Sequence, residues 1–215
     1  MSDALWQRQL TQGLADLNLE LGSASQQQLL AFLALLNKWN RAYNLTAIRD
    51  PEEMVTKHLL DSLAVAPFVS GERLLDVGTG AGLPGIPLAI VYPDKLFELL
   101  DSNGKKTRFL VQVVADLALP NVTVHHKRIE SGELAPVYDG ILSRAFASLA
   151  DMTRDCGPLL AEGGELLAMK GQYPEQELSQ LPKPYIVKGS HALVVPNLAG
   201  ERHLIKIGLP ERGGS

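Results

Sequence analysis

Cysteine is nearly absent from this chain, since Cys156 is the only one among its 215 residues. A single cysteine excludes a disulfide within the chain and a zinc site built from cysteines. The sequence also lacks an apolar run long enough to cross a bilayer, and its first residues lack the basic-then-apolar pattern of a signal peptide. These absences predict a cytoplasmic protein with no membrane partner.

An excess of basic residues is absent as well. The chain has 20 Lys and Arg against 24 Asp and Glu, which gives a formal net charge of −4. Proteins that bind nucleic acid usually carry a basic surface, so the overall charge argues weakly against such a partner. If the partner is a polyanion, a local cluster of cations has to bind it.

The first 66 residues have the spacing of helices. Ser25 and Gln28 form a capping-box pattern, and a further helix is predicted after Pro51. Pro67 and the Ser70–Gly71 pair then predict a boundary. We therefore predict a helical segment, 1–66, and a domain, 67–215, packed as one unit. The apolar residues at helical spacing in the longest segment are Leu29, Phe32, Leu33, Leu36, Trp39 and Tyr43.

From residue 73 onward, short apolar strands alternate with helical stretches. The predicted strands are 74–77, 96–101, 122–125, 140–143 and 164–169, and the clearest helices are 105–117 and 149–160. This alternation predicts an α/β fold in which helices cover both faces of a mostly parallel sheet. Two further extended stretches, 185–195 and 202–209, predict a closing antiparallel pair.

The first strand leads into a glycine-rich turn in the stretch LLDVGTGAGLPGIPLA, residues 74–89. A phosphate-binding P-loop needs a lysine after the glycines, and none follows. A dinucleotide-binding GxGxxG pattern exists at Gly80, Gly82 and Gly85, but it starts two residues after the glycine that directly follows the strand. A tight turn that holds no ligand is the remaining simple alternative.

A third interpretation treats Asp76 and the glycines after it as one unit, an acid followed by GxGxG. Such a turn lets a ligand without phosphate approach the backbone closely, and the Asp76 carboxylate suits a ligand with an ammonium and a sulfonium group. A second acid, Asp101, ends the next strand, where doubly wound folds bind a ribose hydroxyl. This unit resembles the first motif of the class I S-adenosylmethionine (AdoMet) methyltransferases.

The motifs around this turn narrow the resemblance. LDVGTGAGLPGIPLAI, LLDSNGKKTRFL, LSRAFASL and LLAMKG follow one another, and NKWNRAYNLTAI and HLLDSLA precede them. Together they resemble the RsmG (GidB) family, bacterial enzymes that methylate the N7 atom of a guanine in 16S ribosomal RNA. The resemblance covers nearly the whole chain. It implies a class I methyltransferase fold, a Rossmann-like seven-stranded sheet preceded by N-terminal helices.

The resemblance also implies a set of cofactor contacts. The residue pattern itself predicts that Asp76, Gly80 and Asp101 bind AdoMet. To these the resemblance adds Gly78, Leu83, Ile129, Glu130 and Arg144. Other members often have Phe at the position of Leu83 and Ala at that of Ile129. Both exchanges keep an apolar residue, so neither argues against binding of AdoMet, whose product would be S-adenosyl-L-homocysteine.

Methylation of guanine N7 makes few demands on side chains. The atom carries a lone pair and no proton, so no general base is required, and no catalytic residue is assigned. Methylation of a pyrimidine at C5 would need a cysteine nucleophile, and Cys156 is predicted to lie within a helix. Arg144 is the candidate for orienting the guanine through its O6 or for binding a cofactor carboxylate. A structural salt bridge is the alternative role for it.

Several other residues have two interpretations each. Lys105, Lys106 and Arg108, the run 125–128 and Lys170 could meet RNA phosphates or could lie on solvated faces. His58, Asp61 and Ser62 have the residue types of a hydrolytic triad, and His58 and Asp61 share a helix face. The sequence has no GxSxG nucleophile elbow, so we expect these residues to make a helix-surface or interdomain contact instead. No cluster has metal-ligand spacing.

The expected partner is 16S rRNA, either free or within the 30S subunit, and the protein is expected to be monomeric. Three alternatives remain at this point. The chain could methylate another RNA, a small molecule or a protein. It could bind AdoMet and assist ribosome assembly without catalysis. It could also be a dinucleotide-dependent oxidoreductase, which would bind NAD instead.

Overall fold

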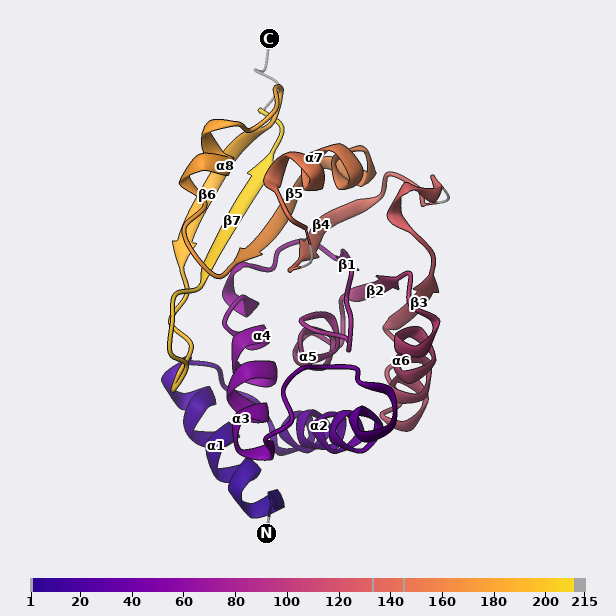
Figure 1. Ribbon diagram of the computed structural model, residues 1–215, viewed down its shortest axis with the longest axis vertical. Coiled ribbons are helices and arrows are strands. Elements are labelled where there is room, and N and C mark those ends of the chain that lie inside the picture. The colour runs from indigo at the N-terminus through magenta and orange to yellow at the C-terminus, as the bar shows by residue number, and fades with distance from the viewer. Residues whose placement is uncertain (1, 133, 145, 211–215) are drawn as a thin grey trace.

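Seven strands form a single sheet in the order β3-β2-β1-β4-β5-β7-β6. The computed structural model describes residues 2–132, 134–144 and 146–210 (Figure 1). Strands β1 to β5 run parallel to one another, whereas β7 is antiparallel to both of its neighbours, β5 and β6. The strands are β1 (Arg73–Val77), β2 (Leu96–Asp101), β3 (Val122–His126), β4 (Tyr138–Ser143), β5 (Leu160–Lys170), β6 (Ile186–Ala192) and β7 (His203–Gly208).

All seven predicted strands exist, and the largest difference in length is in β5. This strand begins at Leu160 because the preceding helix α7 (Leu149–Cys156) ends four residues earlier than its pattern predicts. Pro158 explains the early end, since a proline lacks the N–H needed to continue an α-helix and its ring clashes with the carbonyl four residues earlier. A short 3-10 turn, η4 (Gly157–Leu159), joins the two elements.

Helices pack on both faces of the sheet, as the alternating pattern predicts. One apolar cluster joins Leu74 and Leu142 of the sheet to the helices α1, α2, α5 and α6, and the other joins Leu75 and Ile141 to α7. The helices other than α7 are α1 (Ser2–Asp16), α2 (Ser23–Tyr43), α3 (Pro51–Met54), the π-helix η1 (Val55–Leu60), α4 (Asp61–Leu63), η2 (Ala66–Phe68), α5 (Gly85–Val91), α6 (Gly104–Asp116), η3 (Ile129–Ser131) and α8 (Glu175–Ser179).

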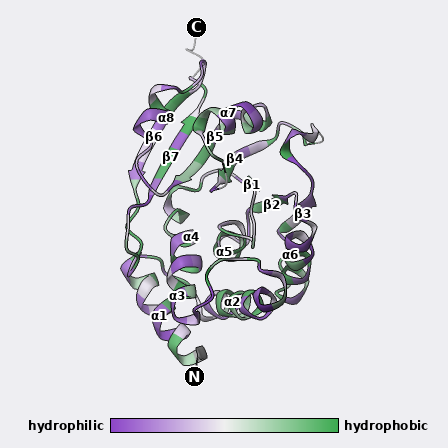
Figure 2. Cartoon of the chain, in the orientation of Figure 1, coloured by the Kyte–Doolittle hydropathy of each residue, from purple (hydrophilic) through white to green (hydrophobic). Residues whose placement is uncertain are grey.

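Helix α2 differs from its prediction at both ends. It begins at Ser23, and the predicted capping box at Ser25 is wrong: Gly22 occupies the cap position with no side-chain cap, and its carbonyl accepts from the Gln26 amide at 3.1 Å. At the other end Tyr43 is 45% exposed, because the apolar face it continues ends there. Figure 2 shows both hydrophilic and hydrophobic residues along α1 and α2, as expected for helices that cover a core.

The N-terminal helices share the core of the sheet. Buried residues of α2, among them Phe32 and Leu36, belong to the same apolar cluster as Phe109 of α6 and Ile86 of α5. The division into 1–66 and 67–215 stays a prediction. Residues of both segments belong to one apolar cluster, which packs the two segments against each other. Within the described residues, no helix combines the length and the apolar character needed to cross a membrane.

Candidate active site at the glycine turn

The glycine turn runs from the end of β1 to the start of α5, and three of its glycines have left-handed backbone. The φ angles are +66° at Gly78, +63° at Gly80 and +88° at Gly82, a region that side chains with a Cβ rarely adopt. A Cβ on Gly82 would lie 2.7 Å from Ile86 and from Leu110, so this glycine is needed for packing. A Cβ on Gly80 would meet nothing nearer than 3.8 Å, so it would project into open space where a ligand can lie.

Two buried aspartates hold this turn in place. Asp76 Oδ2 accepts from the Thr79 hydroxyl at 2.7 Å and from the Gly85 amide at 2.8 Å, which joins β1 to the start of α5. Asp101 Oδ2 accepts from the Gly80 amide at 2.9 Å, and its Oδ1 accepts from the Asn103 amide at 2.8 Å. Both carboxylates therefore shape the backbone that faces the ligand.

The environment of Asp76 is less polar than its hydrogen bonds suggest. Burial raises the pKa of its carboxyl to about 6, against the opposing effect of the bonds from Thr79 and Gly85. Its Oδ1 is buried and accepts no hydrogen bond within the described part of the chain. The predicted contact between Asp76 and an ammonium group stays a prediction.

Two cavities meet at Gly78, on the edge of the sheet where the parallel strands end. The first, of 330 Å³, lies between the ends of β1, β2 and β3, and we call it the β2–β3 cavity; Asp101, Ile129 and Glu130 line it. The second, of 260 Å³, we call the loop cavity. Apart from buried Asp76, the structure thus brings all the predicted cofactor residues to these two cavities. The loop cavity is lined by Leu45, Thr46, His58, Gly78, Thr79, Gly80, Ala81, Leu83 and Arg144.

Arg144 follows β4 and combines the two roles that its sequence context left open. Its Nη1 donates to Asp61 Oδ2 at 3.0 Å, so it forms a salt bridge with α4. Its side chain is nevertheless 35% exposed and lines the loop cavity. The salt bridge and a contact with ligand are therefore compatible.

His58 lines the loop cavity, although its sequence context predicts only a helix-surface or interdomain contact. It lies in the π-helix η1, a rare form that is frequent at functional sites. Its Nε2 lies 3.2 Å from the Thr46 hydroxyl. Burial, with a smaller contribution from the charge of Arg144, lowers its pKa from 6.5 to about 4. The imidazole is therefore neutral at physiological pH.

The basic candidates on α6 and in the run 125–128 separate into three groups. Lys106 and the pair Lys127 and Arg128 line the β2–β3 cavity, and the Lys106 ammonium lies 3.7 Å from Asp101. Lys105 and Arg108 are exposed on α6. The remaining members of the run 125–128 have other partners: His125 contacts Glu98 at 2.6 Å, and His126 contacts the Ser102 carbonyl at 3.2 Å.

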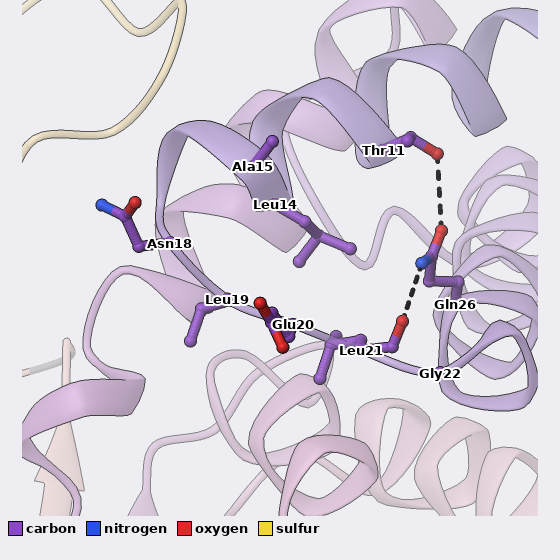
Figure 3. A pocket seen from close by; sticks show the side chains of 9 residues that line it. All are labelled: Thr11, Leu14, Ala15, Asn18, Leu19, Glu20, Leu21, Gly22 and Gln26. Atoms are coloured by element: carbon purple, nitrogen blue, oxygen red, sulfur yellow. Dashed lines mark hydrogen bonds between the residues drawn. The ribbon is translucent and has the colours of Figure 1, made fainter.

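Competing kinds of site find little support. Among the described residues no group of three His, Cys, Asp or Glu could hold a metal ion. Cys156 is buried on α7, and burial raises its pKa to about 12, which disfavours the reactive thiolate. A larger hollow of 730 Å³ lies between the end of α1 and the start of α2 (Figure 3). It lies away from the glycine turn, and Gln26 at its wall is engaged with Thr11 and the Leu21 carbonyl.

Residues 25–205 match the family model described as "GidB: rRNA small subunit methyltransferase G". This chain belongs to that family. The resemblance predicted from the motifs is thereby confirmed. A ribosomal RNA small subunit methyltransferase G of Marinobacter nauticus is 57% identical over 212 residues, covering 99% of both chains. Another of that name, from Pseudomonas aeruginosa, is 52% identical over 92% of each chain.

Solved structures with similar folds include a protein in complex with AdoMet and a methylase. M. jannaschii TYW2 in complex with AdoMet has a TM-score of 0.55 at 17% identity, covering 71% of this chain and 76% of that one. A ribosomal protein L11 methylase from Lactobacillus delbrueckii subsp. bulgaricus has a TM-score of 0.54 at 17% identity, covering 70% and 76%. At this identity the likeness establishes the fold, and the predicted class I fold is confirmed.

Proposed function

We propose that this chain transfers the methyl group of AdoMet to the N7 atom of a guanine in 16S rRNA. The observation that carries the proposal is the pair of cavities meeting at Gly78 in a member of the GidB family. The two cavities lie where open α/β sheets bind their ligands, outside the carboxyl ends of the strands.

The residues present fit AdoMet as the methyl donor. The β2–β3 cavity would take its adenosine, with Asp101 and Glu130 as acceptors and Ile129 as an apolar contact. The open position at Gly80 in the loop cavity would take the methionine end. AdoMet, when bound, supplies a methyl group activated by its sulfonium. The arrangement needs no lysine in the turn, because this donor carries no phosphate.

The chain's own contribution is to place and enclose the reactants. Guanine N7 has no proton to lose. In agreement with this, none of the described residues that line the loop cavity is poised as a base near pH 7, since burial lowers the pKa of His58 to about 4 and its Nε2 is paired with Thr46. Arg144 keeps N–H donors beyond the one engaged by Asp61, for the guanine O6 or for a cofactor carboxylate. Holding the nucleophile and the methyl group in line can lower the barrier by about 7 kcal/mol or more.

The direct test uses ribosomal RNA and 30S subunits that lack this modification. Purified protein and AdoMet are added, the RNA is cleaved at 7-methylguanosine with borohydride and aniline, and primer extension maps the cleavage. We expect one new cleavage in 16S rRNA. If AdoMet binds but no cleavage follows, the chain methylates something else or binds without turnover.

The same assay addresses the partner. Parallel reactions with free 16S rRNA and with 30S subunits reveal which of the two is the substrate. We further propose that the protein acts in the cytoplasm as a monomer. Light scattering of the active protein tests the monomer, for which a mass near 23.3 kDa is expected.

A further inference from the structure

A third cavity lies beside the loop cavity and shares Arg144 with it. It has a volume of 280 Å³ and lies at the edge of the sheet where β5 ends and β7 begins, since Lys170 pairs with His203 in the register of these strands. We call it the β5–β7 cavity. The residues that matter here are Asp61, Arg144, Met169, Lys170, Arg202 and His203.

The lining of this cavity is basic, although the chain as a whole is acidic. Arg144, Lys170 and Arg202 contribute three positive charges, and among the described residues that line the cavity Asp61 is the single carboxylate. The formal net charge of the chain is −4. The cavity is therefore a local cluster of cations of the kind that a polyanionic partner of this chain requires.

Asp61 fixes both arginines and is itself fully engaged. Its Oδ2 accepts from Arg144 at 3.0 Å and its Oδ1 accepts from Arg202 Nε at 2.9 Å, while the side chain is 8% exposed. Arg202 lies in the connection between β6 and β7 and donates to Asp61 of α4. In Figure 1 this connection descends from the sheet toward the N-terminal helices. One buried carboxylate thus holds two guanidinium groups on one cavity.

The arginines retain donors for a ligand. Arg144 donates to Asp61 through Nη1, and Arg202 uses Nε for Asp61 and Nη1 for the Glu201 carbonyl. Each guanidinium has five N–H groups in a planar fork that matches the oxygens of a phosphate. Lys170 adds an ammonium, whose described contacts are Glu177 at 2.9 Å and the Phe146 carbonyl at 3.4 Å.

We propose that the β5–β7 cavity binds a phosphodiester group of the RNA strand next to the target guanine. The inference rests on the proposed function, because it takes the loop cavity as the place of methyl transfer. A phosphate suits the cavity better than a base does. The Watson–Crick edge of a guanine would need acceptors for its N1–H and N2–H groups, and the carboxylate of Asp61 is already shared between two arginines. The O6/N7 edge of the target guanine is the edge that faces the methyl donor in the loop cavity.

Lys170→Gln is the first variant to test, because it removes one cation and leaves the Asp61 pairs intact. RNA binding is measured with S-adenosylhomocysteine present at several KCl concentrations. We expect the slope of log affinity against log salt to fall by about 0.7, the value for one phosphate contact with a single strand. In turnover, KM for RNA should rise about tenfold, as for the loss of one charged hydrogen bond, with kcat and AdoMet affinity unchanged.

Arg154→Gln is the matched control. Arg154 is 65% exposed on α7, pairs with Asp151 and Asp155 and lines none of the three cavities. The Arg154→Gln substitution removes one positive charge, as Lys170→Gln does, but away from the cavities. The salt slope of this variant should therefore equal that of the unsubstituted protein. An equal loss in Lys170→Gln and Arg154→Gln would overturn the proposal, because the effect would then come from overall charge.

A second measurement changes the RNA instead of the protein. A methylphosphonate, which is uncharged, replaces the phosphodiester on either side of the target guanine in turn. At one of the two positions we expect it to weaken binding to the unsubstituted protein by about tenfold and to have little further effect on Lys170→Gln. Independent effects of the two changes at both positions would overturn the proposal, as would a variant that loses AdoMet affinity.

The outcomes separate this proposal from the proposed function. If the unsubstituted protein methylates the RNA while Lys170→Gln keeps its salt slope and KM, the phosphate site alone is wrong. If Lys170→Gln shows the expected change in salt slope but the unsubstituted protein never methylates the RNA, the proposed function is wrong and the phosphate site stands.

Discussion

Asp101 and Gly80 are joined by a hydrogen bond of 2.9 Å, from the glycine amide to the carboxylate Oδ2. The other oxygen of the same carboxylate accepts from Asn103, which caps α6. The acid that ends β2 thus sets the conformation of the turn after β1. Asp101 is therefore expected to affect ligand binding in two ways: by holding the backbone of the glycine turn at Gly80 and by contacting the ligand directly.

Asp101→Asn is expected to weaken AdoMet binding at least tenfold, because an amide has one acceptor oxygen where two are needed. Asp139→Asn is the matched control, since Asp139 Oδ2 accepts from the Glu72 and Arg73 amides at 2.7 and 2.9 Å, away from the cavities. Asp101→Asn should lose about 1–3 kcal/mol of stability. Asp139→Asn should lose less, because its one amide oxygen can still accept from both backbone amides. Calorimetric titration with AdoMet distinguishes them, and equal affinities would contradict a role of Asp101 in the site.

Gly80→Val is expected to abolish AdoMet binding while the fold persists. The valine would fill the open position beside the turn, and the left-handed backbone would cost about 1–2 kcal/mol. Gly163→Val is the control, because Gly163 has a φ of +77° and a Cβ there would meet no atom within 4 Å. Both should be destabilised similarly in thermal unfolding, and unchanged AdoMet affinity in Gly80→Val would show that the ligand lies elsewhere.

Arg144→Ala is expected to lower kcat/KM by more than a hundredfold, since charge-assisted contacts made in the reacting complex contribute several kcal/mol. Its effect on stability should be smaller, about 1 kcal/mol, because the side chain is 35% exposed and Arg202 still pairs with Asp61. Parallel thermal unfolding and kinetics check this. A variant that is inactive only because it is unfolded would leave Arg144 a purely structural salt bridge.

His58 should make the protein less stable in mild acid. Its pKa is about 4 in the folded protein, against 6.5 for an exposed imidazole. Between these values the unfolded chain binds more protons, so stability falls as the pH drops from 7, by about 2 kcal/mol at pH 5. Chemical denaturation at pH 7 and pH 5 should therefore show a smaller loss for His58→Gln than for the unsubstituted protein. His126→Gln, on an exposed histidine, is the control and should behave like the unsubstituted protein.

The strands and the glycine turn could be predicted from sequence because local chemistry determines them. Apolar runs of strand length and glycines with positive φ leave a direct trace in the residue types, as at Gly78 and Gly80. The predicted cofactor residues Ile129 and Arg144 came from the family motifs rather than from local pattern. Their position at the cavities depends on how the strands pair.

What the sequence did not reveal depends on distant packing. The neutral state of His58 follows from burial against residues of another segment, and the π-helix that carries it has no sequence signature. The two partners of Asp61 lie 83 and 141 residues away along the chain. The start of α2 was predicted wrongly because Ser25 matched a capping pattern that the helix, beginning two residues earlier, does not use.

The pairing of Asp61 with Arg144 and Arg202 also has a consequence for synthesis. While the chain grows on a ribosome, the glycine turn and the first four strands can leave the exit tunnel well before residue 202 is added. Until then Asp61 has one arginine instead of two, and the β5–β7 cavity lacks one of its walls. An unfinished chain therefore has the glycine turn without the finished surface beside it, and that surface is completed only after Arg202 has been added.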